Sequence, residues 1–162
     1  MPESNSEARL APGGGDAKNI QTGIPCLEQV FRHFGVTVDG SLAGEYGGGA
    51  VEPSWDQLAQ LAKKHRLRTT LIRPTADELR EVALPAIARM ANGTYVTVAA
   101  CNDEAVFLLD PRLEKPVALS QKQFLEAWGS ELLVFSARYN WDYFKKKYNV
   151  MWFMRVILHY KR

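Results

Sequence analysis

The chain has 162 residues, 46% of them hydrophobic and 23% charged, which is enough to bury one core in a single domain. Its net charge of +2 comes from 20 basic and 18 acidic residues spread along the sequence, so it lacks the basic footprint of a nucleic-acid-binding protein. Cys26 and Cys101 are isolated and have no histidine at ligand spacing, which argues against a zinc site and a disulfide framework. We expect no metal or other cofactor. Neither a secretory signal nor a bilayer-spanning run is recognisable, so the chain as given is expected to be soluble.

The first third of the chain predicts a leader, a helix and a loop. Residues 1–19 carry few large apolar groups and are expected to be a disordered leader. Pro25 suits the first turn of a helix, and Gly35 supplies its C-terminal stop. Between them, apolar residues recur at helical spacing: Leu27, Val30, Phe31 and Phe34. Residues 36–53 are rich in glycine and are expected to form a surface loop.

The middle of the chain predicts a second helix and then strands. Ser54 to Gln57 reads as a capping box, and the helix it opens should end near His65. A strand is expected over residues 67–73, followed by a short helix opening at residues 75–78. Three β-branched, apolar runs then alternate with short polar turns, as in an antiparallel meander: residues 84–90, 94–100 and 105–110.

The last third of the chain completes the predicted sheet, and its composition then becomes aromatic and basic. We expect a strand at residues 117–119, a helix capped by Ser120, and a strand at residues 132–135. Helices first and an antiparallel sheet afterwards indicate an α+β domain. Residues 139–162 crowd aromatic side chains before three lysines and an apolar stretch, which is typical of a juxtamembrane segment. A C-terminal helix packed on the domain's own core is the alternative.

An ordered set of short motifs carries a family resemblance over residues 20–162. The set consists of Gly23, Cys26-Leu27, Ser54-Trp55, Leu84-Pro85-Ala86-Ile87, Asp110-Pro111 and Phe124-Leu125-Glu126-Ala127-Trp128. Together they resemble the papain-like peptidase domain of bacteriocin-processing ABC exporters. The chain is most similar to the degenerate peptidase-like domains at the N-terminus of type I secretion exporters for haemolysin- and RTX-type proteins. Trp55 and Trp128 match family positions in helices and are expected in the core.

The resemblance implies that the catalytic machinery is largely missing. Such a peptidase needs a thiolate, a histidine and a residue that orients the histidine. Alignment places Thr22 on the nucleophile and Cys26 on a second, structural cysteine, and no glutamine matches the oxyanion-stabilising position. The resemblance favours Tyr95 as the replacement of the histidine, with Thr94 as the alternative one residue away. Asp110 matches the orienting aspartate, although turn preferences alone explain it equally well.

Thr22 and Cys26 are the two residues that could replace the missing nucleophile. The hydroxyl of Thr22 is a poor nucleophile without a strong base beside it. Cys26 lies near a helix N-terminus, which would lower the pKa of its thiol, but a cysteine inside an amphipathic helix is usually a small core residue. His33 lies about two helical turns from Cys26, too far for a direct hydrogen bond.

The resemblance therefore implies a domain that binds instead of cutting. We expect residues 20–138 to form a peptidase-like domain that is not an enzyme, and residues 139–162 to lead into a transmembrane domain outside this chain. It would lie on the cytoplasmic side of the bacterial inner membrane, in an exporter that is a dimer, and touch the membrane only through the C-terminal extension. The expected partners are an unfolded RTX-type or adhesin substrate and the rest of the exporter. A residual leader peptidase and a module docking on the exporter's nucleotide-binding domain are the alternatives.

Four residues are expected to contact the substrate: Thr22, Thr94, Tyr95 and Asp110. Tyr95 would offer an aromatic surface to an extended peptide, and Tyr95→Ala is expected to lower affinity by about 1 kcal/mol or more without harming the fold. The alternative is that Tyr95, on an alternating strand, is half-buried sheet packing.

Overall fold

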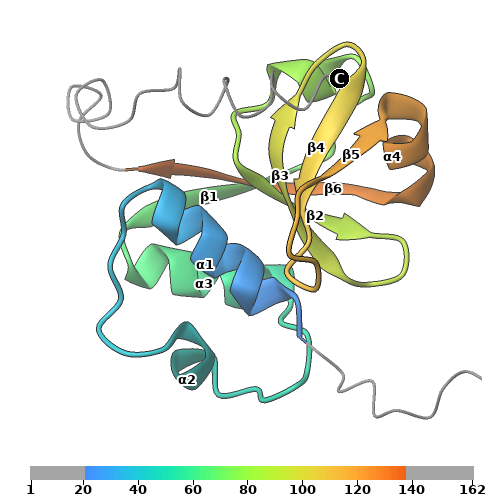
Figure 1. Ribbon diagram of the computed structural model, residues 1–162. Coiled ribbons are helices and arrows are strands. Elements are labelled where there is room, and N and C mark those ends of the chain that lie inside the picture. Colours follow the sequence, from blue (N-terminus) through green and yellow to red (C-terminus); the bar gives the residue numbers. More distant parts are fainter. Residues whose placement is uncertain (1–20, 138–162) are drawn as a thin grey trace, which may run out of the picture.

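The computed structural model describes residues 21–137 as one sheet with three helices gathered on one side of it (Figure 1). The expected leader at residues 1–19 and the expected linker at residues 139–162 lie outside the described residues. None of the helices within 21–137 is long and apolar enough to cross a membrane.

Three helices precede the sheet in the chain: α1 (Gly23–His33), α2 (Leu42–Tyr46) and α3 (Trp55–Lys64). The capping box that predicted α3 is present, because Ser54 accepts from the backbone of Gln57 and the Gln57 side chain accepts from the backbone of Ser54. The expectation that residues 36–53 form only a loop is wrong. Ser41 caps α2, and burial of Leu42 holds this five-residue helix against the core.

The strands and the remaining helices follow in the predicted order: β1 (Leu67–Ile72), η1 (Glu78–Glu81, a 3₁₀ turn), β2 (Ala86–Met90), β3 (Tyr95–Cys101), β4 (Ala105–Leu109), β5 (Val117–Ser120), α4 (Gln121–Ala127) and β6 (Trp128–Ala137). The sheet order is β1-β6-β2-β3-β4-β5, and all neighbours are antiparallel. The predicted α+β class and the meander of β2, β3 and β4 are confirmed. The last strand is longer than residues 132–135 and lies inside the sheet, between β1 and β2.

Alternating side chains divide the interior into two cores, one on each face of the sheet. On one face, Leu133 and Phe135 of β6 and Tyr95 of β3 pack with the buried side chains of α1 and α3. On the other, Val96 and Val98 of β3 pack with Phe124 and Trp128, whose rings stack with centroids 5.2 Å apart. The expectation that Trp128 is a core residue is confirmed.

Trp55 is only partly buried. Its ring packs on the first core, while its indole N–H donates to the carboxylate of Glu131 over 2.7 Å. The same carboxylate accepts two hydrogen bonds from Arg73, so Trp55 joins the core to a surface ion pair.

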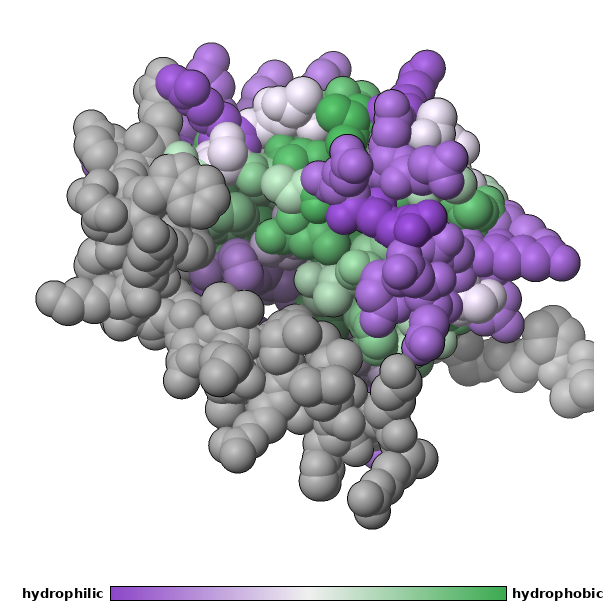
Figure 2. All heavy atoms as spheres, turned by 90° about the horizontal axis from the view of Figure 1, so that it is seen from above, coloured by the Kyte–Doolittle hydropathy of each residue, from purple (hydrophilic) through white to green (hydrophobic). Residues whose placement is uncertain are grey.

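The side of the molecule away from α1, α2 and α3 exposes some apolar surface. Figure 2, a view from the top of Figure 1, shows hydrophobic residues bordered by hydrophilic ones. A hollow of about 440 Å³ lies between β1, β6 and η1, and Ile72, Val82 and Val134 are among its lining residues. None of the predicted site residues lines this hollow.

Candidate functional site

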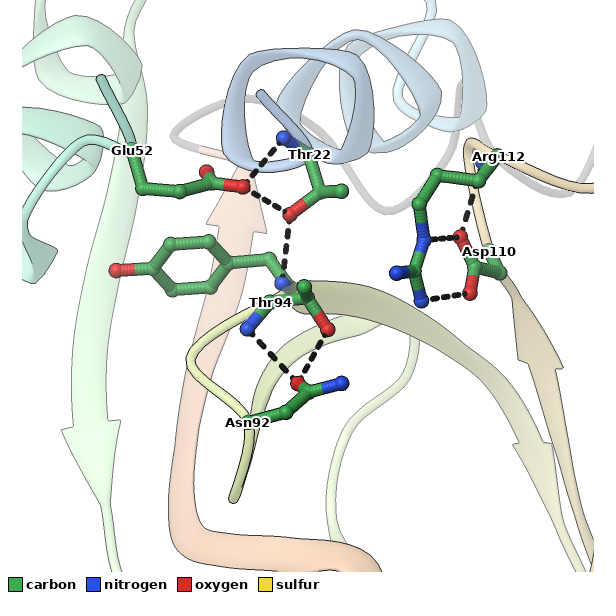
Figure 3. Close-up of polar contacts among 7 residues, drawn as sticks. Thr22, Glu52, Asn92, Thr94, Asp110 and Arg112 are labelled. Atoms are coloured by element: carbon green, nitrogen blue, oxygen red, sulfur yellow. Dashed lines mark hydrogen bonds and ion pairs between the residues drawn. The ribbon is translucent and has the colours of Figure 1, made fainter. Parts of the chain in front are cut away.

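The N-terminus of α1 holds Thr22, the residue aligned with the missing nucleophile. Its hydroxyl donates to Oε1 of Glu52 over 2.5 Å and accepts the backbone N–H of Tyr95 over 2.8 Å. The backbone N–H of Thr22 also donates to Oε1 of Glu52, over 2.6 Å, and that of Gly23 donates to Oε2, over 2.9 Å. Figure 3 shows Glu52 reaching the start of the helix from the neighbouring loop. Thr22 is fully buried and its hydrogen-bonding groups are engaged.

The segment that carries Glu52 is fixed against the first turn of α1. The side-chain amide of Gln21 donates to the backbone oxygens of Gly49 and Val51, over 3.2 and 2.9 Å. A Cβ atom added at Gly23 would lie 2.5 Å from Cγ of Pro53, so only glycine permits this approach. Residues 49–53 therefore close over Thr22 at the position where a nucleophile would have to be accessible.

Tyr95 packs in the core and is more deeply buried than the half-buried sheet position of the packing alternative. Its side chain is fully buried, and its hydroxyl donates to the backbone oxygen of Pro53 over 2.6 Å. The ring meets Trp55 edge to face at 5.0 Å, and the guanidinium of Arg89 lies 5.7 Å from its centroid. Burial raises the pKa of the Tyr95 phenol to about 12, so the group stays protonated. This burial opposes the expectation that Tyr95→Ala spares the fold.

Thr94 and Asp110 line the same pocket. The pocket has a volume of about 330 Å³ and lies at the turn ends of β3 and β4. Its lining is mainly apolar, with Met90, Val96, Leu108, Leu113, Val117 and Leu119, while Asn92, Thr94, Asp110 and Arg112 add polar groups. Tyr95 does not line it, because neighbouring residues of a strand point to opposite faces. The structure thus favours Thr94 over Tyr95 as the counterpart of the histidine that Asp110 would orient.

Asp110 has a partner that the sequence did not single out. Its Oδ1 accepts from the backbone N–H and Nε of Arg112, over 2.9 and 3.0 Å, and its Oδ2 accepts from Nη2 over 2.7 Å. These hydrogen bonds to Arg112 are the main reason why the pKa of Asp110 is lowered. Thr94 is engaged separately, since its hydroxyl donates to Oδ1 of Asn92 over 2.7 Å. In Figure 3, Thr94 turns to Asn92 while Asp110 turns to Arg112.

The cysteine near the helix start lies in surroundings that disfavour its thiolate. Cys26 is fully buried within the core of α1, and this burial raises the pKa of its thiol to about 12 despite a hydrogen bond with Thr97. A reactive cysteine requires the opposite shift. His65 also packs near this core, but its Nε2 bonds to the carboxylate oxygens of Glu45, over 3.1 and 3.2 Å, and not to Cys26.

The structure therefore separates the four predicted substrate-binding residues into two pairs. Thr94 and Asp110 line the pocket, whereas Thr22 and Tyr95 are buried behind it, joined by the hydrogen bond from Tyr95. Contact of these residues with a substrate stays a prediction. Within residues 21–137, no group of three or more potential metal ligands is gathered.

Glu52 is the site residue that sequence reasoning missed. It stands alone at the end of a glycine-rich segment, 30 residues from Thr22, and belongs to no motif. Pro53 and the capping residue Ser54 follow Glu52 directly and mark where the loop ends and α3 begins, but they do not indicate a contact with Thr22.

Comparison with known proteins agrees with this fold. The model of the Peptidase C39 family matches residues 16–140. No curated protein matches the chain significantly. Similar solved structures include a double glycine motif protease from an AMS/PCAT transporter, in complex with its leader peptide, at 16% identity and a TM-score of 0.63 over 71% of this chain and 83% of that one. The peptidase domain of Streptococcus ComA, a bifunctional ABC transporter, has 18% identity and a TM-score of 0.63 over 73% and 92%.

A further similar structure is the N-terminal peptidase C39 like domain of a toxin secretion ATP-binding protein from Vibrio parahaemolyticus. It has 16% identity and a TM-score of 0.59 over 73% of this chain and 98% of that one. At such identities the likeness establishes the fold, which is the papain-like fold of these domains, and leaves the activity of this chain to its own residues. Because the family model covers most of the sequence, the chain belongs to the Peptidase C39 family.

Proposed function

We propose that this chain is a non-proteolytic N-terminal domain of a type I secretion ABC exporter, on the cytoplasmic side of the bacterial inner membrane, and that it binds the unfolded substrate before export. One observation carries the proposal: the position of the nucleophile is a buried threonine bonded to a carboxylate, while an apolar pocket remains beside Thr94 and Asp110. Peptide binding can persist without catalysis, because binding depends on the residues that line the pocket and catalysis depends on the nucleophile. Membership in a family of exporter peptidase domains supports the context.

The pocket suits an extended, partly apolar peptide. Its aliphatic lining can take a side chain, and the rim offers the hydroxyl of Thr94 and the Asp110–Arg112 pair to the peptide backbone. Leu113 at the rim is 54% exposed, so it can meet a ligand without any rearrangement. A folded passenger would present few such segments, which is why we expect a preference for the unfolded chain.

The test measures the binding of an RTX-type passenger in its calcium-free, unfolded form and in its calcium-bound, folded form. We expect tighter binding of the unfolded form, and Leu113→Asp should weaken it about fivefold or more by placing a charge at the rim. Leu71→Asp is the matched control, because Leu71 is also exposed, at 43%, but lies on β1 at the other edge of the sheet. Equal binding of both passenger forms, or equal losses in both variants, would contradict the proposal.

A residual leader peptidase is the second candidate, because a similar fold belongs to a double glycine motif protease. The buried Thr22 and the raised pKa of Cys26 oppose it. Incubating the chain with a double-glycine leader peptide, before and after thiol alkylation, decides the matter. We expect no cleavage in either sample, and cleavage that alkylation abolishes would show a working cysteine nucleophile.

A further inference from the structure

The start of α1 carries two backbone N–H groups that point out of the helix, those of Thr22 and Gly23. In a peptidase with its nucleophile at this position, such donors stabilise the negative charge that develops on the attacked carbonyl oxygen. Here both donors are already used by the two oxygens of Glu52, over 2.6 and 2.9 Å. A substrate carbonyl would have to displace Glu52 to reach either of these two donors.

The same carboxylate lies beside the atom that would carry the negative charge of a nucleophile at position 22. Oε1 of Glu52 is 2.5 Å from the hydroxyl oxygen of Thr22, and an ionised carboxylate can only accept a hydrogen bond from that hydroxyl. A thiolate in place of the hydroxyl would face a negative charge at hydrogen-bond distance, and like charges this close oppose ionisation. We infer that Glu52 silences this site independently of Thr22, by filling its anion-stabilising donors and by opposing a thiolate at position 22.

Two further observations support a fixed, inhibitory Glu52. Its segment is held by Gln21, by the close approach of Pro53 to Gly23, and by the Tyr95 hydroxyl on the Pro53 oxygen, so the carboxylate cannot swing away at little cost. Its charge also acts at longer range, since Glu52 contributes to raising the pKa of the Cys26 thiol and of the Tyr95 phenol.

The inference rests on the proposed absence of peptidase activity and deepens it. Restoring a cysteine at position 22 and a histidine at position 94 would not restore a nucleophile while Glu52 remains. A peptide held at the pocket of Thr94 and Asp110 would likewise lack the helix-end donors that a scissile carbonyl requires. The domain can therefore hold a peptide beside this site without cutting it.

The test introduces Thr22→Cys and measures how the thiol alkylation rate depends on pH. Cys101→Ala removes the more exposed native thiol, and peptide-level mass spectrometry separates the new thiol from Cys26. The other titratable or charged groups around position 22 are Cys26, Tyr95 and the Asp110–Arg112 pair, and they stay the same in all variants. The midpoints are compared between variants with and without Glu52, because burial by residues 49–53 raises the thiol pKa in both, whereas only one of them carries the Glu52 charge.

We expect the thiol pKa of Thr22→Cys to lie above the ordinary value of about 8.5, and we expect Glu52→Gln in the same chain to lower it by about one unit or more, which is a tenfold gain of thiolate at fixed pH. Glu131→Gln is the matched control, because Glu131 is also a hydrogen-bonded carboxylate but contacts Trp55 and Arg73, and it should leave the midpoint unchanged. Equal midpoints with and without Glu52, or a midpoint below 8.5 with Glu52 present, would overturn the inference. Neither result touches passenger binding, so the proposed function is judged separately.

A second measurement covers the case in which the double variant does not fold. Amide hydrogen exchange of the otherwise unchanged chain and of Glu52→Ala reports the Thr22 and Gly23 N–H groups directly. We expect at least tenfold faster exchange of these two amides in Glu52→Ala, with the amides of β6 unchanged. Unaltered protection at both positions would show that Glu52 does not occupy these donors in solution.

Discussion

Substitution of Tyr95 distinguishes a role in core packing from a role in substrate binding, because the two roles predict very different losses of stability. Tyr95→Phe keeps the buried ring and removes only the hydroxyl, which leaves the Pro53 oxygen without its donor at a cost of about 1–2 kcal/mol. Tyr95→Ala also empties the space between Trp55 and the start of α1, and truncating a buried aromatic side chain costs about 3–5 kcal/mol. Since small domains are stable by only about 5–15 kcal/mol, the second change removes a large share of the total.

Urea unfolding followed by tryptophan fluorescence measures these losses. With an m-value of about 1.5 kcal/mol/M, the midpoint should fall by about 1 M for Tyr95→Phe and by about 2–3 M for Tyr95→Ala. Leu113→Ala is the control, because Leu113 is 54% exposed and its truncation should shift the midpoint by less than about 0.5 M. A loss below about 1 kcal/mol for Tyr95→Ala would refute the packing role and return Tyr95 to the candidates for direct substrate contact.

Two further predictions concern the neighbours of Thr22 and the rim of the pocket. Gly23→Ala should cost about 1–3 kcal/mol in thermal or urea unfolding, because the new Cβ would lie 2.5 Å from Pro53, whereas Gly44→Ala meets only an ordinary contact at 3.8 Å and should be neutral or stabilising. Equal effects of the two changes would contradict the close approach. Arg112 lowers the pKa of Asp110, so the Asp110 carboxylate stabilises the fold above the unfolded-state pKa of about 3.9, and this contribution is lost as the pH falls through the lower folded-state pKa. Asp110→Asn should therefore cost roughly 1 kcal/mol or less at pH 7 and less still at acid pH, and a loss that grows as the pH falls would contradict the ion pair.

Elements with a local signal were predictable from the sequence. The capping boxes at Ser54 and Ser120 are contained within four residues each, and both helices start where these boxes place them. The meander was predictable for the same reason, because each strand is an apolar, β-branched run and each connection is a short polar turn. In contrast, α2 has Gly44 in its middle and only five residues, so it depends on burial of Leu42 and leaves little trace in local preferences.

The candidate site was less predictable because its contacts join distant segments. Pro25 lies in the first turn of α1, as predicted, but the first N–H groups of the helix donate to Glu52, about 30 residues away, which no local pattern indicates. Thr94 immediately precedes β3, so strand alternation predicts that Thr94 and Tyr95 face opposite sides of the sheet, but the sequence does not show which side holds Asp110. That assignment needed the pairing of β3 with β4, which places Thr94 and Asp110 at one pocket.

The place of β6 in the sheet has a consequence for how the chain is made. This strand comes last among the described elements, yet it lies between β1 and β2 and pairs with both. Until residue 137 has left the ribosome, β6 cannot form, so β1 and the helix α3 that packs on it cannot be connected through β6 to the sheet of β2, β3 and β4. We therefore expect folding to follow synthesis of this region instead of accompanying it, so that a nascent chain halted before Trp128 stays open to proteases.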